Sequence, residues 1–137
     1  MRAAVLIAVL AAAAVGCGVG SGATDATPSA DLRITVWPQG RGHGGATAWT
    51  LRCSPAGGTL PRRAAACTKL ATMSNPFAPP PKDQVCTEQY GGPQQALVTG
   101  AFRGHRVWIQ LGLRNGCEIA RARRLSFLVP GFGSSAA

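Results

Sequence analysis

The sequence predicts one small α+β domain that is stapled by disulfides and exported from the cell. Runs in which apolar and polar residues alternate occur in both halves of the chain, and this pattern is typical of strands. An alanine-rich segment with helical spacing lies between these runs, and four cysteines follow an N-terminal one. The 137 residues leave room for one domain of about 100 residues once the two ends are set aside.

The N-terminus has the composition of an export signal. Arg2 supplies a positive charge, residues 3–15 are uninterruptedly apolar, and small residues precede Cys17. This run is shorter than the about 20 residues that a membrane-spanning helix needs. We expect residues 1–17 to be a signal peptide that ends in a lipobox-like sequence in which Cys17 is acylated. Ordinary cleavage near Ala23 is the alternative, so the product is expected to be secreted or anchored to the outer face of the membrane.

The cysteine count supports this division of the chain. Five cysteines are an odd number for an exported protein, but lipidation of Cys17 leaves four that can pair completely in an oxidising compartment. These are Cys53, Cys67, Cys86 and Cys117. Pairing of Cys53 with Cys67 and of Cys86 with Cys117 fits the order of the elements below, although four cysteines allow three connectivities and the others stay open.

The composition argues against several classes of function. The chain has five acidic residues, two histidines in turn-like segments, no CxxC and no Ser-His-Asp pattern, so we expect no enzyme, no metal and no cofactor. The net charge is +9, and it becomes +8 when Arg2 leaves with the signal. The arginines are scattered without aromatic platforms, so we expect no nucleic-acid binding. Attraction to anionic polymers of the cell envelope is an alternative use of this charge.

The first half of the mature chain predicts a linker and a hairpin. Residues 18–30 are rich in Gly, Ser, Ala and Thr and should form a flexible linker. Alternation from Leu32 to Val36 predicts a strand that Pro38 ends, and glycines at 39–45 predict a turn. Residues 46–53 predict the next strand, antiparallel to the first.

A helix and a stiff connector are expected next. Residues 62–74 are alanine-rich, and Ala66, Cys67, Leu70 and Met73 recur at helical spacing. Residues 75–82 contain four prolines, which cannot continue a helix or join a central strand.

The second half predicts another hairpin and a short helix. The strands are expected at 96–99 and 105–111, separated by residues 100–104. We expect a turn at 115–117, a basic helix at 118–124 and a last strand at 125–129. The Gly/Ser/Ala tail at 131–137 is expected to be disordered.

One polar segment, residues 85–93, stands out as the working part of the chain. Cys86 ties it down, and two glycines and Pro93 close it. Such a loop on a disulfide-stapled scaffold is where binding function is usually found.

From Cys53 to Phe127 the chain resembles the Streptomyces subtilisin inhibitor family of actinobacterial protease inhibitors. The shared motifs are Cys53-Ser54-Pro55, Gly58-Thr59-Leu60-Pro61, Ala66-Cys67-Thr68-Lys69-Leu70, Cys86 with Tyr90 and Pro93, Gly100 to Val107, and Asn115-Gly116-Cys117-Glu118. The resemblance implies a five-stranded antiparallel sheet with two helices over residues 31–130, disulfides Cys53–Cys67 and Cys86–Cys117, and a homodimer packed through the sheet. It also implies inhibition of serine proteases by a substrate-like loop.

Counting from Cys86, the family pattern implies that the reactive bond is Glu88-Gln89. Cys86, Thr87, Tyr90 and Gly91 would complete the inhibitory loop. One additional glycine before Pro93 leaves a second register open, in which Gln89 takes the specificity position. The resemblance also implies that Asn115 supports the loop, with a simple Asn-Gly turn as the alternative.

Glu88 is the main departure from the family, whose members commonly carry methionine, lysine or arginine at this position. A carboxylate is costly to bury in the apolar pocket of subtilisin. We therefore expect weak inhibition of subtilisin and trypsin, and a glutamate-preferring serine protease as the matching target. The alternative is an envelope lipoprotein with a basic binding surface that has kept the scaffold and lost inhibition.

Overall fold

The computed structural model describes residues 27–132. The predicted signal peptide, Cys17 and most of the predicted linker lie outside these residues, as do residues 133–137. Within residues 27–132, no helix combines the length and the apolar character that a membrane crossing requires.

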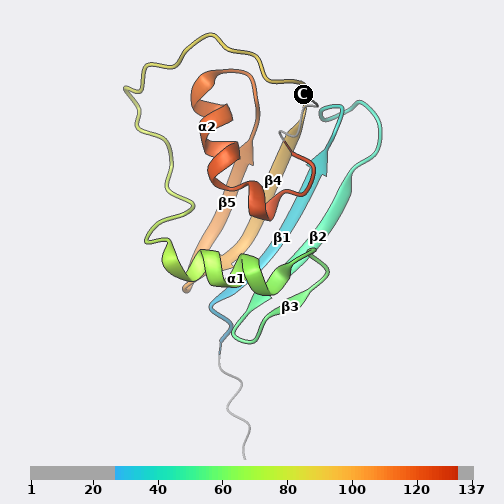
Figure 1. Cartoon of the computed structure of the whole chain (residues 1–137), viewed down its shortest axis with the longest axis vertical. Helices are drawn as coiled ribbons and strands as arrows, with labels where there is room; N and C mark the ends of the chain where they lie inside the picture. Colours follow the sequence, from blue (N-terminus) through green and yellow to red (C-terminus); the bar gives the residue numbers. More distant parts are fainter. Residues whose placement is uncertain (1–26, 133–137) are drawn as a thin grey trace, which may run out of the picture.

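A single antiparallel sheet of five strands carries the fold, in the order β3-β2-β1-β4-β5 (Figure 1). The strands are β1 (Ala30–Trp37), β2 (Thr47–Cys53), β3 (Gly57–Gly58), β4 (Gln95–Phe102) and β5 (His105–Leu111). The central strand β1 places Ile34 opposite Trp49 on one side and Val98 on the other. The predicted α+β class with a five-stranded sheet is therefore confirmed.

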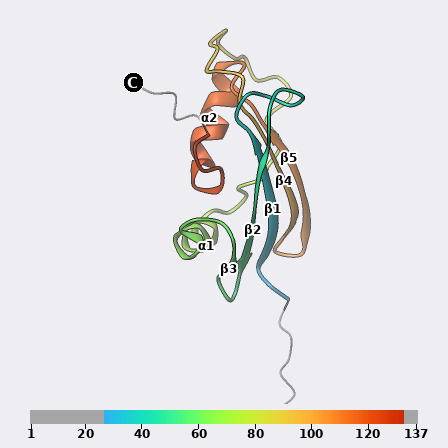
Figure 2. The same cartoon turned by 90° about the vertical axis from the view of Figure 1, so that its right-hand side faces the viewer.

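Helices cover only one face of this sheet (Figure 2). They are α1 (Arg63–Thr72), α2 (Gly116–Arg124) and the short 3-10 helix η1 (Ser126–Leu128). The period-two pattern of β1 turns Leu32, Ile34 and Val36 toward the helices, and each of the three is at most 4% exposed. The core forms between the sheet and the helices, and the other face of the sheet stays uncovered within the described chain.

Both predicted disulfides are present, and they lie at opposite ends of the domain. Cys53–Cys67 joins the end of β2 to α1, and Cys86–Cys117 joins the long connection after α1 to the first turn of α2. We call the end where β1 finishes and α2 begins the loop end, because residues 85–93 cross it, and the end where β1 begins the opposite end (Figure 1).

The predicted strand at 125–129 is wrong, because these residues contain η1. Leu125, Leu128 and Val129 are all at most 1% exposed, so this apolar segment fills the core as a tight helical turn instead of pairing with a strand. The core also extends to Phe132, which is 5% exposed and lies within the segment expected to be a disordered tail.

The fifth strand is instead β3, which the sequence analysis did not identify. Its two glycines pair with Leu51 and Arg52 at the edge of the sheet. Gly58 has a φ of 97°, and a Cβ there would collide with the carbonyl oxygen of Thr50. A pair of glycines carries no alternating pattern, so periodicity could not reveal this strand.

The second hairpin has a shorter turn than predicted. Arg103 and Gly104 alone make the turn, and Gly100 lies inside β4, where a Cβ would collide with the carbonyl oxygen of Asp31. Arg103 adopts a φ of 48° and connects the hairpin to the C-terminal end of α1. Its guanidinium donates hydrogen bonds of 2.9–3.4 Å to the carbonyl groups of Leu70, Ala71, Met73 and Ser74.

Candidate functional site

The segment from Val85 to Tyr90 is an exposed loop at the loop end of the domain. It belongs to no helix or strand, and Thr87, Glu88 and Gln89 are all exposed. Val85 is 96% exposed and Tyr90 is 68% exposed. Large apolar and aromatic groups left in solvent beside polar ones are typical of a surface that binds another molecule.

Three links tie this loop to the scaffold on both sides of Glu88. The disulfide Cys86–Cys117 joins it to α2, and the backbone N–H of Gly116 donates a hydrogen bond of 3.0 Å to the carbonyl oxygen of Thr87. After Glu88, the N–H of Gly91 donates a hydrogen bond of 2.7 Å to the carbonyl oxygen of Leu113. Glu88 and Gln89 are therefore exposed between two fixed points.

The backbone around Glu88 is also ordered by a hydrogen bond within the loop. The N–H of Gln89 donates to the carbonyl oxygen of Thr87 at 2.9 Å, which makes a three-residue turn centred on Glu88. The same carbonyl oxygen accepts the hydrogen bond from Gly116. The nitrogen of the predicted reactive bond is thus linked through Thr87 to the start of α2.

Two glycines allow the loop to lie directly on α2. A Cβ on Gly116 would collide with the hydroxyl oxygen of Thr87, and a Cβ on Gly91 would come within 3.1–3.2 Å of Ile119 and Leu113. At both positions the absence of a side chain brings the loop backbone against the scaffold.

The predicted turn at 115–117 is wrong, because these residues begin α2. Asn115 is the N-cap, and its side-chain oxygen accepts a hydrogen bond of 3.0 Å from the N–H of Glu118. The link to the loop comes from the next residue, Gly116, which the sequence analysis did not single out. An Asn followed three residues later by Glu is a helix-start signal that could have shown this. Support of the loop by the Asn115 side chain itself stays a prediction.

An ion pair strengthens the segment between β5 and α2. The carboxylate of Glu118 accepts hydrogen bonds from the guanidinium of Arg114, the shortest at 2.7 Å, and from the Arg114 backbone N–H at 2.9 Å. Burial raises the pKa of Glu118, but the hydrogen bonds and charge of Arg114 outweigh it and leave the pKa below its ordinary value. This pair therefore stabilises the folded protein at neutral pH, and its contribution is lost as the pH falls through the lowered pKa.

The basic helix α2 also holds the proline-rich connector that leads to the loop. The guanidinium of Arg121 donates to the carbonyl oxygen of Ala78 at 3.0 Å, and that of Arg124 donates to the carbonyl oxygen of Asn75 at 3.0 Å. These hydrogen bonds hold a segment that has no regular secondary structure. Helix α2 therefore fixes the position of the connector as well as that of the loop.

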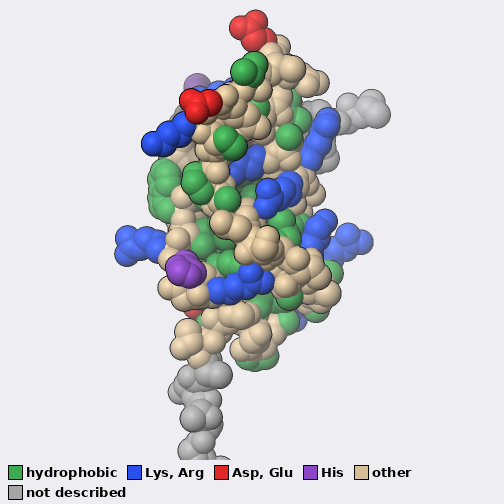
Figure 3. Space-filling model, turned by 90° about the vertical axis from the view of Figure 1, so that its left-hand side faces the viewer, with side chains coloured by type: hydrophobic (Ala, Val, Ile, Leu, Met, Phe, Trp, Pro, Cys, Tyr) green, Lys and Arg blue, Asp and Glu red, His purple; other side chains and the backbone are tan. Residues whose placement is uncertain are grey.

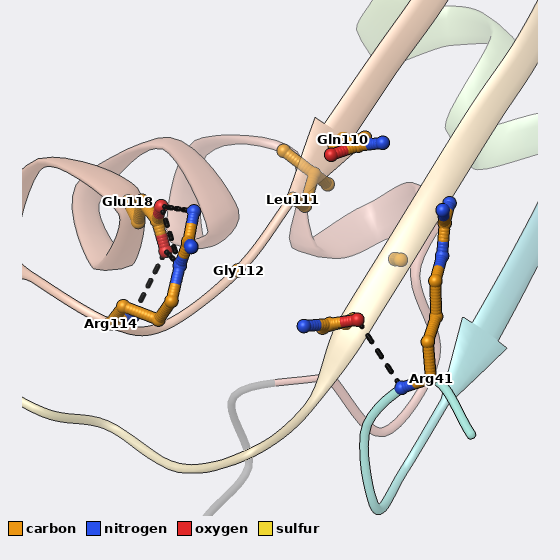
Figure 4. A pocket seen from close by; sticks show the side chains of 8 residues that line it. Arg41, Gln110, Leu111, Gly112, Arg114 and Glu118 are labelled. Carbon is orange, nitrogen blue, oxygen red and sulfur yellow. Dashed lines mark hydrogen bonds and ion pairs between the residues drawn. The ribbon is translucent and has the colours of Figure 1, made fainter. Parts of the chain in front are cut away.

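A small cavity of about 120 Å³ lies beside the start of β4 and the end of β5 (Figure 4). The Arg114–Glu118 pair lines one side, and Arg41, whose N–H donates to the Gln95 side chain at 3.2 Å, lines the other. This space is smaller than the about 300 Å³ from which small-molecule sites usually start. Among residues 27–132, no group of three or more His, Cys, Asp or Glu side chains is placed to hold a metal ion.

If the loop inhibits proteases as the resemblance implies, Gly116→Ala should weaken inhibition about 10- to 100-fold, because the new methyl group displaces Thr87 and disturbs one anchoring hydrogen bond. Stability should change little, since alanine favours helix α2 more than glycine does. Inhibition constants and thermal unfolding of the same preparation would separate the two effects. Gly45→Ala is the matched control, because a Cβ there meets nothing within 4 Å. Equal inhibition by the two variants would contradict the proposed anchor.

A family model identifies the family of this chain. The family model described as "Subtilisin inhibitor-like" matches residues 27–115. The search of curated proteins gave no significant match. Among solved structures, the chain is similar to one in the crystal structure of Streptomyces caespitosus sermetstatin in complex with Bacillus licheniformis subtilisin, with 31% identity, coverage of 74% of this chain and 97% of that chain, and a TM-score of 0.45. The chain belongs to the subtilisin inhibitor-like family.

Proposed function

We propose that this protein inhibits serine proteases by presenting residues 86–91 as a substrate-like loop whose reactive bond is Glu88-Gln89. Membership of the subtilisin inhibitor-like family makes it a serine protease inhibitor and not an enzyme. The observation that carries the assignment of the loop is its anchoring. Thr87 and Gly91 are each hydrogen-bonded to the scaffold, while Glu88 and Gln89 between them are exposed.

Rigidity explains how such a loop inhibits instead of being digested. A loop that is ordered before binding loses little conformational entropy in the active site, so its contacts with the protease appear as affinity. Cutting the bond after Glu88 would separate two chain ends that both stay attached. The disulfide Cys86–Cys117 and Gly116 hold one end, and the bond from Gly91 to Leu113 holds the other. The new amine of Gln89 therefore stays close to the acyl group and can attack it again.

Glu88 defines the expected specificity. Its side chain is exposed in the free protein, so binding in a specificity pocket would remove a carboxylate from water. In an apolar pocket this costs several kcal/mol, whereas a pocket with basic or hydroxyl groups compensates for the lost hydration. We infer that the target is a subtilisin-like or a glutamate-preferring serine protease, and that Glu88 favours the second.

Two further parts of the proposal concern assembly and location. No described helix covers one face of the sheet (Figure 2), and that face carries Trp108, which is 61% exposed; we propose that a homodimer packs through it. Sedimentation equilibrium would measure the dimer.

We also propose that the protein is secreted, or anchored to the outer face of the cell membrane through acylated Cys17. Mass spectrometry of the N-terminus would distinguish acylated Cys17 from cleavage near Ala23.

A protease panel tests the proposed function directly. The mature protein is incubated with subtilisin, trypsin and glutamate-preferring serine proteases, and any cut is mapped by mass spectrometry. We expect tight inhibition of a glutamate-preferring enzyme and one slow cut between Glu88 and Gln89. The fragments should stay linked through Cys86–Cys117 until the disulfide is reduced. A cut after Gln89 would support the alternative register, and rapid digestion elsewhere would rule out the mechanism.

A further inference from the structure

We propose that the opposite end of the domain docks on an anionic membrane surface and leaves the inhibitory loop free. Three features of the molecule support this docking: the cations gathered at the opposite end, the place where the N-terminal chain enters the fold, and the distance from that place to the loop. It does not depend on which protease the loop inhibits.

Carboxylates are concentrated at the loop end of the domain. Asp83 and Glu88 lie within three residues of Cys86, and Glu118 is in the first turn of α2. The fourth described carboxylate, Asp31, is in β1 near the opposite end, where its oxygen lies 3.9 Å from the guanidinium of Arg52. Figure 3 agrees with this distribution, because the prominent acidic side chains of that face lie at its upper end.

The opposite end is rich in cations. Six exposed basic side chains lie at the end of β2, along α1 and around the turn between β4 and β5, and we call them the basic end. They are Arg52, Arg62, Arg63, Lys69, Arg103 and Arg106. Among the described residues at this end, Asp31 is the one carboxylate that opposes them. Polybasic surfaces of this size are attracted to anionic lipids.

The N-terminal chain enters the fold at the same end. Two backbone hydrogen bonds fix the entry point: the N–H of Ser29 donates to the carbonyl oxygen of Cys53 at 3.0 Å, and the N–H of Arg103 donates to the carbonyl oxygen of Ser29 at 2.8 Å. Cys53 ends β2, and Arg103 is in the turn after β4 and is itself part of the basic end. Any attachment of the preceding sequence to a membrane would therefore bring the basic end toward the lipid.

The geometry keeps inhibition compatible with docking. The eight residues of β1 span about 25 Å, so the loop lies well beyond the about 10 Å over which charges act at 0.1 M salt. Carboxylates near the loop would then neither oppose docking nor be covered by it. The basic end carries six cations against one carboxylate, while the remaining described residues carry seven cations and three carboxylates over a larger part of the domain. A lipid surface fits this arrangement because the end with the larger positive excess is also the end at which the N-terminal chain enters.

Vesicle binding tests this proposal. The probe is the chain without residues 1–17, which retains every described helix and strand and both disulfides. It is sedimented with vesicles of phosphatidylcholine alone or with 30 mol% phosphatidylglycerol, at about 0.05 and 0.2 M salt. We expect binding only to the anionic vesicles, with weaker binding at the higher salt concentration. No binding, or equal binding to both vesicles, would overturn the proposal.

Two charge-matched variants locate the docking surface. Arg62→Gln with Arg63→Gln removes two cations from the basic end at the start of α1, away from the uncovered face of the sheet, and each neutralised cation should weaken binding about fivefold, or about 25-fold for the pair. Arg41→Gln with Lys82→Gln removes two cations outside the basic end and should change binding less than about twofold. Equal losses would indicate attraction to the whole net charge, which contradicts docking through one end. Binding to soluble polyphosphate but not to vesicles would also contradict it.

Protease inhibition gives an independent readout of orientation. The same protein bound to anionic vesicles should inhibit its protease as well as the free protein does, because the loop faces away from the lipid. Loss of inhibition on vesicles would overturn the orientation. Vesicle binding by a protein that inhibits no protease would support the docking surface and contradict only the proposed inhibitory function.

Discussion

Glu88→Met is expected to strengthen inhibition of subtilisin by about two to three orders of magnitude. The wild-type protein must bury the carboxylate of Glu88 in the apolar specificity pocket of subtilisin. Burial of a methionine side chain in the same pocket is favourable, because its apolar surface is removed from water. The rest of the loop is unaffected, because its anchors are the Cys86–Cys117 disulfide and the backbone of Thr87 and Gly91. Inhibition constants for subtilisin, measured at equilibrium, would show the change, and inhibition of a glutamate-preferring protease should fall in parallel.

Two further substitutions separate charge from register. Glu88→Gln keeps the shape of the side chain and removes its charge, so it should give an intermediate gain against subtilisin. Gln89→Met should change inhibition little if Glu88 occupies the specificity pocket. A large gain with Gln89→Met and none with Glu88→Met would establish the alternative register and refute the assignment of Glu88.

Replacing Cys86 and Cys117 together by serine is expected to convert the inhibitor into a substrate. Cys86 and Cys117 are 31 positions apart in the sequence, and loss of their disulfide should lower the free energy of unfolding by about 4 kcal/mol in the chain-entropy model. It should also free the end of the loop before Glu88, so that the cut ends separate before they can reseal. We expect a loss of inhibition of about 100-fold or more, together with rapid cutting after Glu88.

The other disulfide supplies the matched control. Cys53 and Cys67 are 14 positions apart in the sequence. Replacing both by serine removes their disulfide and should lower the free energy of unfolding by about 3 kcal/mol. This pair lies at the opposite end of the domain, so the folded fraction should still inhibit. Both variants are compared at a temperature at which circular dichroism shows each to be folded. Equal loss of inhibition would mean that global stability, and not local anchoring of the loop, controls function.

Local sequence patterns predicted most of the fold because each long strand has one buried face. Alternation located β1, β2, β4 and β5, and the cysteine order agreed with the observed disulfides. The same reasoning failed at β3, which has no side chains to alternate, and at residues 125–129. An apolar run as short as this one fits a strand or a buried turn equally well, so packing decides between them.

The exposed loop with Glu88 at its centre was identified from residue types, because a cysteine, polar residues and closing glycines are all visible in the sequence. Its support was decided by the tertiary structure. The hydrogen bonds from Gly116 to Thr87 and from Gly91 to Leu113 join backbone groups of residues that are far apart in the sequence. Every residue type has these backbone groups, so the sequence does not indicate which of them will pair. Likewise, the count of arginines gave the net charge, but only the fold placed three of the four described carboxylates at the loop end and gathered six cations at the opposite end. Charge and chemistry are properties of residues, whereas anchoring and orientation depend on which distant backbone segments the packed core brings together.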